Sequence, residues 1–196
     1  MPLSELLSPF AEWLPTLTSA QMEALAAHLQ LLQKWNRKIN LTAIRDLPEA
    51  VRRHIAESLF LAAQLPPGPV TICDLGSGGG FPGVPVAIAR PDCRVTLVES
   101  DVRKSVFLRE AARPLPNIGV TNSRFEDLSG RFDWLISRAV NVAPIKRGPI
   151  CANVALLTKE TSGPISGLFH KWKWTSIAIP WSGDSQVLLG TPVNIG

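Results

Sequence analysis

Residues 71 to 83 read TICDLGSGGGFPG, an apolar run that ends in an acid and is followed by five glycines. Glycine lets a ligand approach the backbone closely. A dinucleotide fingerprint, G-x-G-x-x-G, counted from Gly76 would need a glycine at the position of Phe81, and counted from Gly78 it would include Pro82. A phosphate-binding P-loop needs a lysine, which this segment lacks. The run therefore predicts a ligand loop that matches neither phosphate motif.

Two acids accompany the glycines. Asp74 stands at the end of the apolar run, and Glu99 ends the next apolar run, TLVES. A carboxylate at the end of a second strand can accept hydrogen bonds from ribose hydroxyls. S-adenosylmethionine offers a ribose, an ammonium and a positive sulfur, all favourable beside carboxylates. We therefore expect this cofactor, although the spacing alone does not separate it from NAD. In a simpler interpretation the glycines form a tight turn, and each acid caps the turn or helix after it.

Basic residues are concentrated in one segment. Residues 1 to 33 contain three acids and no Lys or Arg, whereas residues 34 to 53 contain six cations: Lys34, Arg37, Lys38, Arg45, Arg52 and Arg53. A segment of this kind suits a polyanion such as nucleic acid, and a solvated helical face is the alternative.

Helical patterns fill the N-terminal third. Thr18 and Gln21 are typical of a capping box, and apolar residues at helical spacing predict a helix over 19–36. A second helix is expected over 48–63, before the helix-breaking residues Pro66, Pro67 and Gly68. We expect residues 1–66 to form a helical extension and residues 67–196 to form one compact core.

From Val70 onward strands and helices alternate. Strands are expected at 70–75, 94–100, 118–121, 132–137 and 152–158, and helices at 83–90, 102–113 and 142–149. The segments 172–180 and 185–193 are expected to form an antiparallel pair at the sheet edge. This order predicts an α/β, Rossmann-like fold with a largely parallel sheet and helices on both faces. Its ligands would lie beyond the carboxyl ends of the strands.

Several ordered blocks resemble the bacterial small-subunit ribosomal RNA guanine-N7 methyltransferases, the RsmG or GidB family. They are KWNRKINLTAIRD (34–46), RHIAESL (53–59), DLGSGGGFPGVPVAIARP (74–91), TLVES with RK and FLRE (96–110), SRFEDL (123–128) and SRAV (137–140). The resemblance implies a class I methyltransferase fold and methyl transfer from S-adenosylmethionine to N7 of a guanine in small-subunit (16S) rRNA. The C-terminal third departs from the family pattern, since Lys159 is followed by Glu160 rather than by glycine.

The resemblance also suggests roles for single residues. Glu99 would hold the ribose, Phe125 with Glu126 would bracket the adenine, and Arg138 would lie beside the methionine end or the guanine, unless it forms a structural salt bridge. The full cofactor set is Asp74, Gly76, Ser77, Gly78, Gly80, Phe81, Glu99, Phe125, Glu126 and Arg138. The RNA-facing set is Lys34, Arg37, Lys38, Arg45, Arg52, Arg53 and His54, of which His54 could instead be structural. No general base is expected, because guanine N7 carries no proton at neutral pH.

Composition limits the remaining possibilities. The 196 residues are 45% hydrophobic and 18% charged, without an apolar stretch long enough to span a membrane and without the basic start of a signal peptide. The three widely spaced cysteines fit reduced, buried thiols and no metal site. We expect a cytoplasmic monomer that binds small-subunit rRNA or the small ribosomal subunit and no membrane. The alternatives are a small-molecule methyltransferase and a non-catalytic nucleotide-binding or RNA-binding protein.

Overall fold

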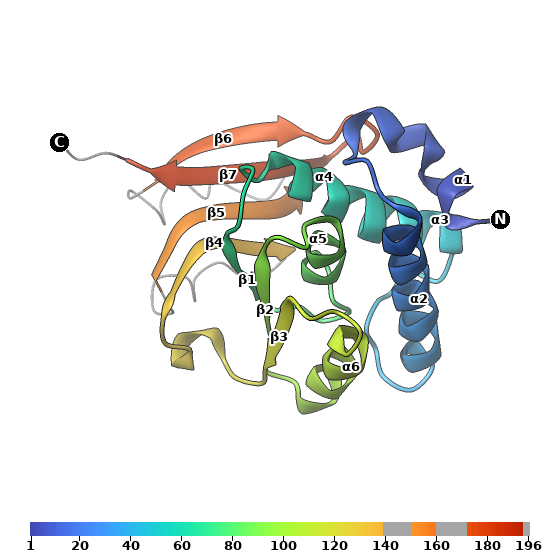
Figure 1. The fold of residues 1–196 in the computed structure, drawn as a ribbon, viewed down its shortest axis with the longest axis horizontal. Helices are drawn as coiled ribbons and strands as arrows, with labels where there is room; N and C mark the ends of the chain where they lie inside the picture. The colour runs from blue at the N-terminus through green and yellow to red at the C-terminus, as the bar shows by residue number, and fades with distance from the viewer. Residues whose placement is uncertain (139–149, 160–171, 194–196) are drawn as a thin grey trace.

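A seven-stranded sheet forms the centre of the computed structural model, which describes residues 1–138, 150–159 and 172–193. The strand order is β3-β2-β1-β4-β5-β7-β6 (Figure 1). The strands are β1 (Thr71–Leu75), β2 (Arg94–Val98), β3 (Ile118–Thr121), β4 (Arg131–Arg138), β5 (Ile150–Lys159), β6 (Trp172–Ala178) and β7 (Ser185–Pro192). The pairs among β1 to β5 are parallel, and β7 is antiparallel to both β5 and β6.

The seven predicted strands are confirmed, each within about two residues of its expected ends. The predicted antiparallel pair at the sheet edge is also confirmed, because β6 is the edge strand and β7 pairs with it. The helix predicted over 142–149 lies outside the described residues.

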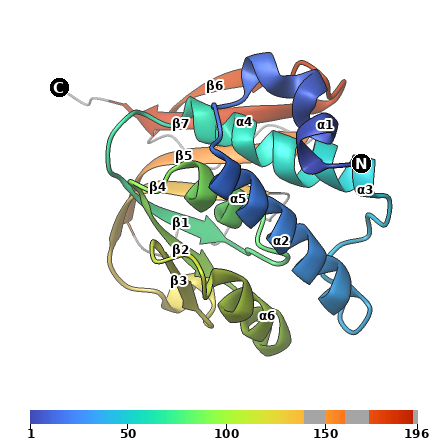
Figure 2. The same cartoon turned by 45° about the vertical axis from the view of Figure 1, so that its right-hand side comes forward.

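The helices on one side of the sheet are α2 (Ser19–Asn36), α4 (Glu57–Gln64), α5 (Gly83–Ala89) and α6 (Val102–Ala112), as Figure 2 shows. Their buried residues share one apolar cluster with alternate strand residues such as Ile72 and Ile136. The intervening residues, such as Cys73 and Leu135, point to the opposite face and pack in a second cluster that includes Phe125. Of the predicted helices on both faces, the described residues show those on the first face.

The N-terminal helices follow from local signals. Thr18 and Gln21 form the predicted capping box at the start of α2. The second predicted helix is a continuous run of α3 (Leu47–Ala50), the π-helical turn η2 (Val51–Ala56) and α4. Asp46 caps this run by accepting a hydrogen bond from the Glu49 amide. Two short elements were not predicted, α1 (Leu3–Leu7) and the 3₁₀ segment η1 (Ser8–Trp13).

The N-terminal helices and the sheet share one hydrophobic core. Leu25 and Leu29 of α2 belong to the same buried cluster as Val84 of α5 and Phe107 of α6. Residues on both sides of the expected boundary at 66 therefore stabilise each other by apolar burial. The division into an extension and a core stays a prediction.

Two further observations concern composition. Cys73, Cys93 and Cys151 are buried, as predicted. Within the described ranges, the structure contains no helix with the length and apolar character needed to cross a bilayer.

Candidate functional site

The glycine turn joins β1 to α5 at the carboxyl edge of the sheet. Gly76, Gly78 and Gly80 have φ values of 69°, 52° and 88°, a left-handed conformation that favours glycine. The Gly76 and Ser77 amides donate to the Val98 carbonyl, at 2.9 and 3.1 Å, and the Gly80 and Phe81 amides donate to the Ser77 carbonyl. These four amides are therefore used inside the protein and do not point at a phosphate.

Glu99 follows β2 and faces this turn. Its side chain is 7% exposed. Oε2 accepts a hydrogen bond from the Gly78 amide at 2.9 Å, and Oε1 accepts one from the Asp101 amide at 2.8 Å. Because each carboxylate oxygen can accept two hydrogen bonds, both oxygens keep capacity for ligand hydroxyl groups. The structure thus orients Glu99 through two backbone donors.

Asp74 lies beneath the turn and is fully buried. Its Oδ2 accepts a hydrogen bond from the Gly83 amide at 3.1 Å, and its Oδ1 has no partner among the described residues. Burial raises the pKa of Asp74 to about 7, and the hydrogen bond from the Gly83 amide opposes this rise. The turn therefore encloses a carboxyl group with one unused oxygen.

The predicted glycine site divides into two halves. Gly76 is exposed and Gly78 is half-buried, whereas Gly79, Gly80 and Phe81 are buried. The Phe81 ring stacks on His54 at 4.5 Å between ring centroids and lies 5.0 Å from His28. Phe81 thus faces the N-terminal helices, a placement that gives no support to its predicted contact with a cofactor.

Phe125 and Glu126 belong to the short 3₁₀ segment η3 (Phe125–Asp127), which follows β3. Phe125 is buried in the second apolar cluster with Leu75 and Val98, the last residues of β1 and β2. Glu126 is exposed. The structure therefore brings Phe125 to the strand ends beside the glycine turn, and its predicted contact with an adenine stays a prediction.

Arg138 ends β4 and forms an ion pair with Glu57 of α4, with 2.7 Å between Nη1 and Oε2. Glu57 is buried, and its Oε1 lies 3.6 Å from Arg53 Nε and accepts a hydrogen bond from Ser182 Oγ at 3.3 Å. The structural salt bridge considered for Arg138 is therefore present. The sequence reasoning did not single out Glu57, although an acid inside the apolar run IAESLFLAA is a signal of a buried ion pair.

The predicted RNA-facing residues fall into three groups. Lys34, Arg37, Lys38 and Arg45 are exposed. Arg52 is half-buried and makes two 2.8 Å hydrogen bonds to Glu49, and Arg53 is half-buried beside Glu57. His54 is 8% exposed, which leaves its ring little surface for an RNA contact. Only the first group presents exposed cations to a polyanion, and within it Arg45 Nη1 also donates to the Asn36 carbonyl at 3.4 Å.

A hollow of about 310 Å³ adds two cations that sequence reasoning did not include. It is lined by Lys38, Ile39 and Asn40 before the turn into α3, and by Asp101, Arg103 and Lys104 at the start of α6. Arg103 and Lys104 form the RK pair of a block that resembles the family, and that position was the available signal. Three cations and one acid thus surround a hollow at the carboxyl edge of the sheet.

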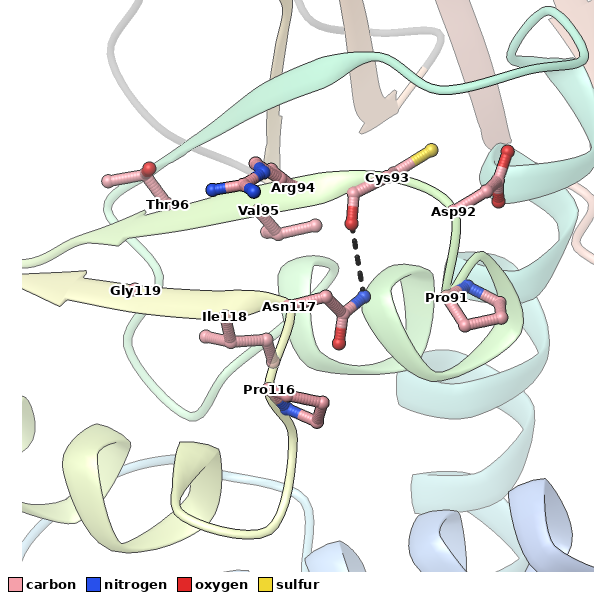
Figure 3. Close-up of a pocket in the computed structure, with 10 residues that line it drawn as sticks. All are labelled: Pro91, Asp92, Cys93, Arg94, Val95, Thr96, Pro116, Asn117, Ile118 and Gly119. Carbon is pink, nitrogen blue, oxygen red and sulfur yellow. Dashed lines mark hydrogen bonds between the residues drawn. The ribbon is translucent and has the colours of Figure 1, made fainter.

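A larger hollow, of about 610 Å³, lies at the other end of the sheet (Figure 3). It is lined by residues 91–96 and 116–119, which precede or begin β2 and β3. Asn117 spans it by donating to the Cys93 carbonyl at 3.2 Å. This hollow is at the amino ends of the strands, where parallel sheets do not bind their ligands. Among the described residues, no cluster of three or more His, Cys, Asp or Glu could hold a metal ion.

Comparisons with known proteins agree with the resemblance found in the sequence. The family model described as rRNA small subunit methyltransferase G, GidB, matches residues 21–147. The protein named ribosomal RNA small subunit methyltransferase G from Chromobacterium violaceum is 43% identical over 140 residues, which are 69% of this chain and 66% of that protein. The protein of the same name from Stenotrophomonas maltophilia is 46% identical over 129 residues, which are 64% of this chain and 60% of that protein. The chain thus matches about 60 to 66% of the length of these relatives.

Solved structures of methyltransferases share the fold. A methyltransferase from Pyrococcus furiosus superposes with a TM-score of 0.55 at 13% identity, covering 84% of this chain and 96% of that chain. A ribosomal protein L11 methylase from Lactobacillus delbrueckii superposes with a TM-score of 0.58 at 13% identity, covering 70% of this chain and 77% of that chain. The predicted class I methyltransferase fold is therefore confirmed.

Proposed function

We propose that this chain, which belongs to the rRNA small subunit methyltransferase G family, transfers a methyl group from S-adenosylmethionine to N7 of a guanine in small-subunit (16S) rRNA. The proposal rests on the matched residues 21–147, which include the glycine turn, Glu99 and the basic segment. A cytoplasmic location is part of the same proposal, because small-subunit rRNA is a cytoplasmic substrate in bacteria. A monomeric state stays a prediction.

The arrangement of Glu99 and the turn amides is the observation that carries the proposal. Four amides of the turn are bonded within the protein, and the Gly78 amide is bonded to Glu99. A phosphate would need such donors to be free. A carboxylate held at the end of β2 instead suits the hydroxyl groups of a ribose. The site thus favours a nucleoside without a pyrophosphate over NAD.

The residues present fit S-adenosylmethionine in a second respect. Asp74 Oδ1 is a buried acceptor with no partner among the described residues. An ammonium group is the kind of donor that a buried carboxylate requires, and its positive charge would lower the raised pKa of Asp74. Glu99 would hold the ribose and Asp74 would balance the positive charge.

The exposed cations support RNA over a small-molecule substrate. Lys38 and Arg45 lie exposed in the segment between α2 and α3, and Arg103 lies exposed in the first turn of α6. Lys38 and Arg103 line the same hollow, which Asp101, two residues after Glu99, also lines. A small-molecule substrate gives no reason for such a group of exposed cations. An RNA substrate does, because its phosphates bind cations.

The proposed methyl transfer requires few catalytic groups from the protein. S-adenosylmethionine supplies an electrophilic methyl group, and guanine N7 supplies an exposed lone pair without a proton to remove. The protein needs no general base. Its residues hold the ribose at Glu99, bind the RNA backbone through the exposed cations, and exclude water around an unstacked base, so that the two reactants are placed in line.

The test is methylation of small-subunit rRNA by the purified protein, with N7-methylguanine located by mass spectrometry of nuclease fragments. We expect one methylated guanine in small-subunit rRNA and none in a large-subunit rRNA control. Glu23→Gln, at an exposed position on α2, should act like wild type, and Glu99→Gln should be nearly inactive. Methylation of a small molecule but not of either rRNA or intact small subunits would contradict the proposal.

A further inference from the structure

His54 lies between the two functional segments of the molecule and contacts both. On one side, its ring is parallel to Phe81 of the glycine turn, with an interplanar angle of 12° and 4.5 Å between centroids. On the other side, its Nε2 is 2.7 Å from Oγ1 of Thr42. One buried side chain therefore joins the turn to the loop between α2 and α3.

Thr42 organises the loop that carries Lys38 and Arg45. Its Oγ1 accepts a hydrogen bond from the Ile44 amide at 3.1 Å. Its backbone amide donates to Asn36 Oδ1 at 3.1 Å, and its carbonyl accepts from Asn36 Nδ2 at 2.9 Å. With both sides of its backbone and its hydroxyl bonded, Thr42 cannot move without the loop that bears the cations.

The buried half of the glycine turn, Gly79 and Gly80, is closely packed against neighbouring residues. A Cβ atom at Gly80 would lie 2.9 Å from His28 Cε1, and one at Gly79 would lie 3.1 Å from Leu32 Cδ1 and 3.5 Å from the Leu41 carbonyl. Little space for an added side-chain atom therefore separates the turn from α2 and from Leu41, the neighbour of Thr42. If the loop between α2 and α3 shifted toward the turn, it would displace the turn backbone. The Gly78 amide, which donates to Glu99, belongs to that backbone.

The His54 ring suits a positioning role because it stays neutral. Burial, together with the nearby positive charges of Arg138 and Arg53, lowers the pKa of His54 to about 3, against a smaller opposing effect of Glu49. A neutral ring can stack on Phe81 and share one hydrogen bond with Thr42, donating or accepting according to its tautomer. Its Nδ1 has no partner among the described residues, so Thr42 supplies the hydrogen bond that orients the ring.

We infer that His54 is a positioning residue that links RNA binding to cofactor binding. This inference rests on the proposed function. RNA that binds Lys38 and Arg45 fixes the loop, Thr42 fixes the His54 ring, and the ring fixes Phe81 and the glycine turn beside Glu99. Binding of either ligand then makes binding of the other more favourable, as reciprocal coupling requires.

The test measures the coupling factor, which is the ratio of the S-adenosylhomocysteine dissociation constants without and with RNA. S-adenosylhomocysteine is used because it allows no turnover, and the RNA is small-subunit rRNA or small subunits without the methyl group. In wild type we expect RNA to tighten binding about tenfold, within the usual range of coupled sites.

Two substitutions remove the link and one retains it. Thr42→Val removes the hydroxyl at nearly constant volume, and His54→Phe keeps a stacked ring but loses the hydrogen bond. In both we expect the coupling factor to fall below about threefold, with thermal unfolding confirming a folded protein. Thr42→Ser keeps the hydroxyl and should retain the wild-type factor, which a general loosening of the loop would not do.

The outcomes separate the inference from the function on which it rests. A coupling factor that is unchanged in folded Thr42→Val and His54→Phe, or that is close to one in wild type, would overturn the inference while leaving the methyltransferase assignment intact. Wild-type protein that binds no S-adenosylhomocysteine at all would overturn both.

Discussion

The two halves of the glycine turn are both rich in glycine but lie in different environments. Gly76 and Gly78 lie on the open side next to Glu99, whereas Gly80 and Phe81 are packed under His28 and His54. The repeated glycines of the motif therefore do not all belong to one ligand-binding surface. Its first half is shaped for a ligand, and its second half is shaped by the N-terminal helices.

The largest effect should come from filling the buried half. Gly80→Ala places a Cβ 2.8 Å from Val84 Cγ2 and 2.9 Å from His28 Cε1, at a φ of 88°. Overpacking and the left-handed conformation together should lower the free energy of unfolding by about 2 to 5 kcal/mol, measured by urea denaturation. Gly68→Ala is the matched control, because its φ is 90° with nothing within 4 Å, and it should cost only about 1 to 2 kcal/mol. Equal losses at the two positions would contradict the packing argument.

A change on the open half should affect ligand binding more than folding. Glu99→Gln removes the negative charge that faces Gly78 and the expected ribose. Loss of charge-assisted hydrogen bonds should weaken S-adenosylhomocysteine binding by about 2 to 3 kcal/mol, or roughly 30-fold to 150-fold, measured by calorimetric titration. Affinity within threefold of wild type would remove Glu99 from the ligand site.

The acid under the turn should give a pH signature. The pKa of Asp74 is raised to about 7 in the folded protein. Between about pH 4 and pH 7 the unfolded chain loses this proton and the folded chain keeps it, so the wild type loses stability as pH rises. The stability of Asp74→Asn relative to wild type should therefore increase by about 2 kcal/mol from pH 5 to pH 7 and level off above. A difference that stays constant over this range in urea denaturation would contradict the raised pKa.

The smallest effect should come from a single exposed cation. Lys38→Ala should weaken RNA binding by about twofold to fivefold and reduce the slope of log affinity against log salt by about 0.7, the loss of one phosphate contact. It should not change S-adenosylhomocysteine binding in the absence of RNA, because Lys38 lies outside the turn. Arg109→Ala, an exposed cation in the last turn of α6, is the control and should keep the wild-type slope.

Strong local patterns predicted most of the fold. The capping box of Thr18 and Gln21, the alternation of the strands and the break at residues 66 to 68 each act over a few residues, so they are visible in one sequence. The segment before Leu14 was not predicted, because Pro2 and Pro9 are more often found outside helices, although both are allowed near a helix start. The π-helical turn η2 has no sequence signature of its own and depends on packing.

The site was predictable only where its residues follow a strand end. Glu99 and Asp74 were found because position in a parallel sheet fixes their location. The burial of His54 and the partners of Arg52, Arg53 and Arg138 depend on contacts between distant segments, such as Glu57 with Arg138. Charge counting cannot distinguish a cation that is free from one that is paired with a buried acid.

The position of β7 in the sheet also affects the order in which the strands can pair. In sequence β7 follows β6, but in the sheet it lies between β5 and β6. During synthesis β6 leaves the ribosome first and has no strand to pair with until Ser185–Pro192 has emerged. The parallel strands can therefore pair before β6 does, whereas β6 can join the sheet only once β7 has been made.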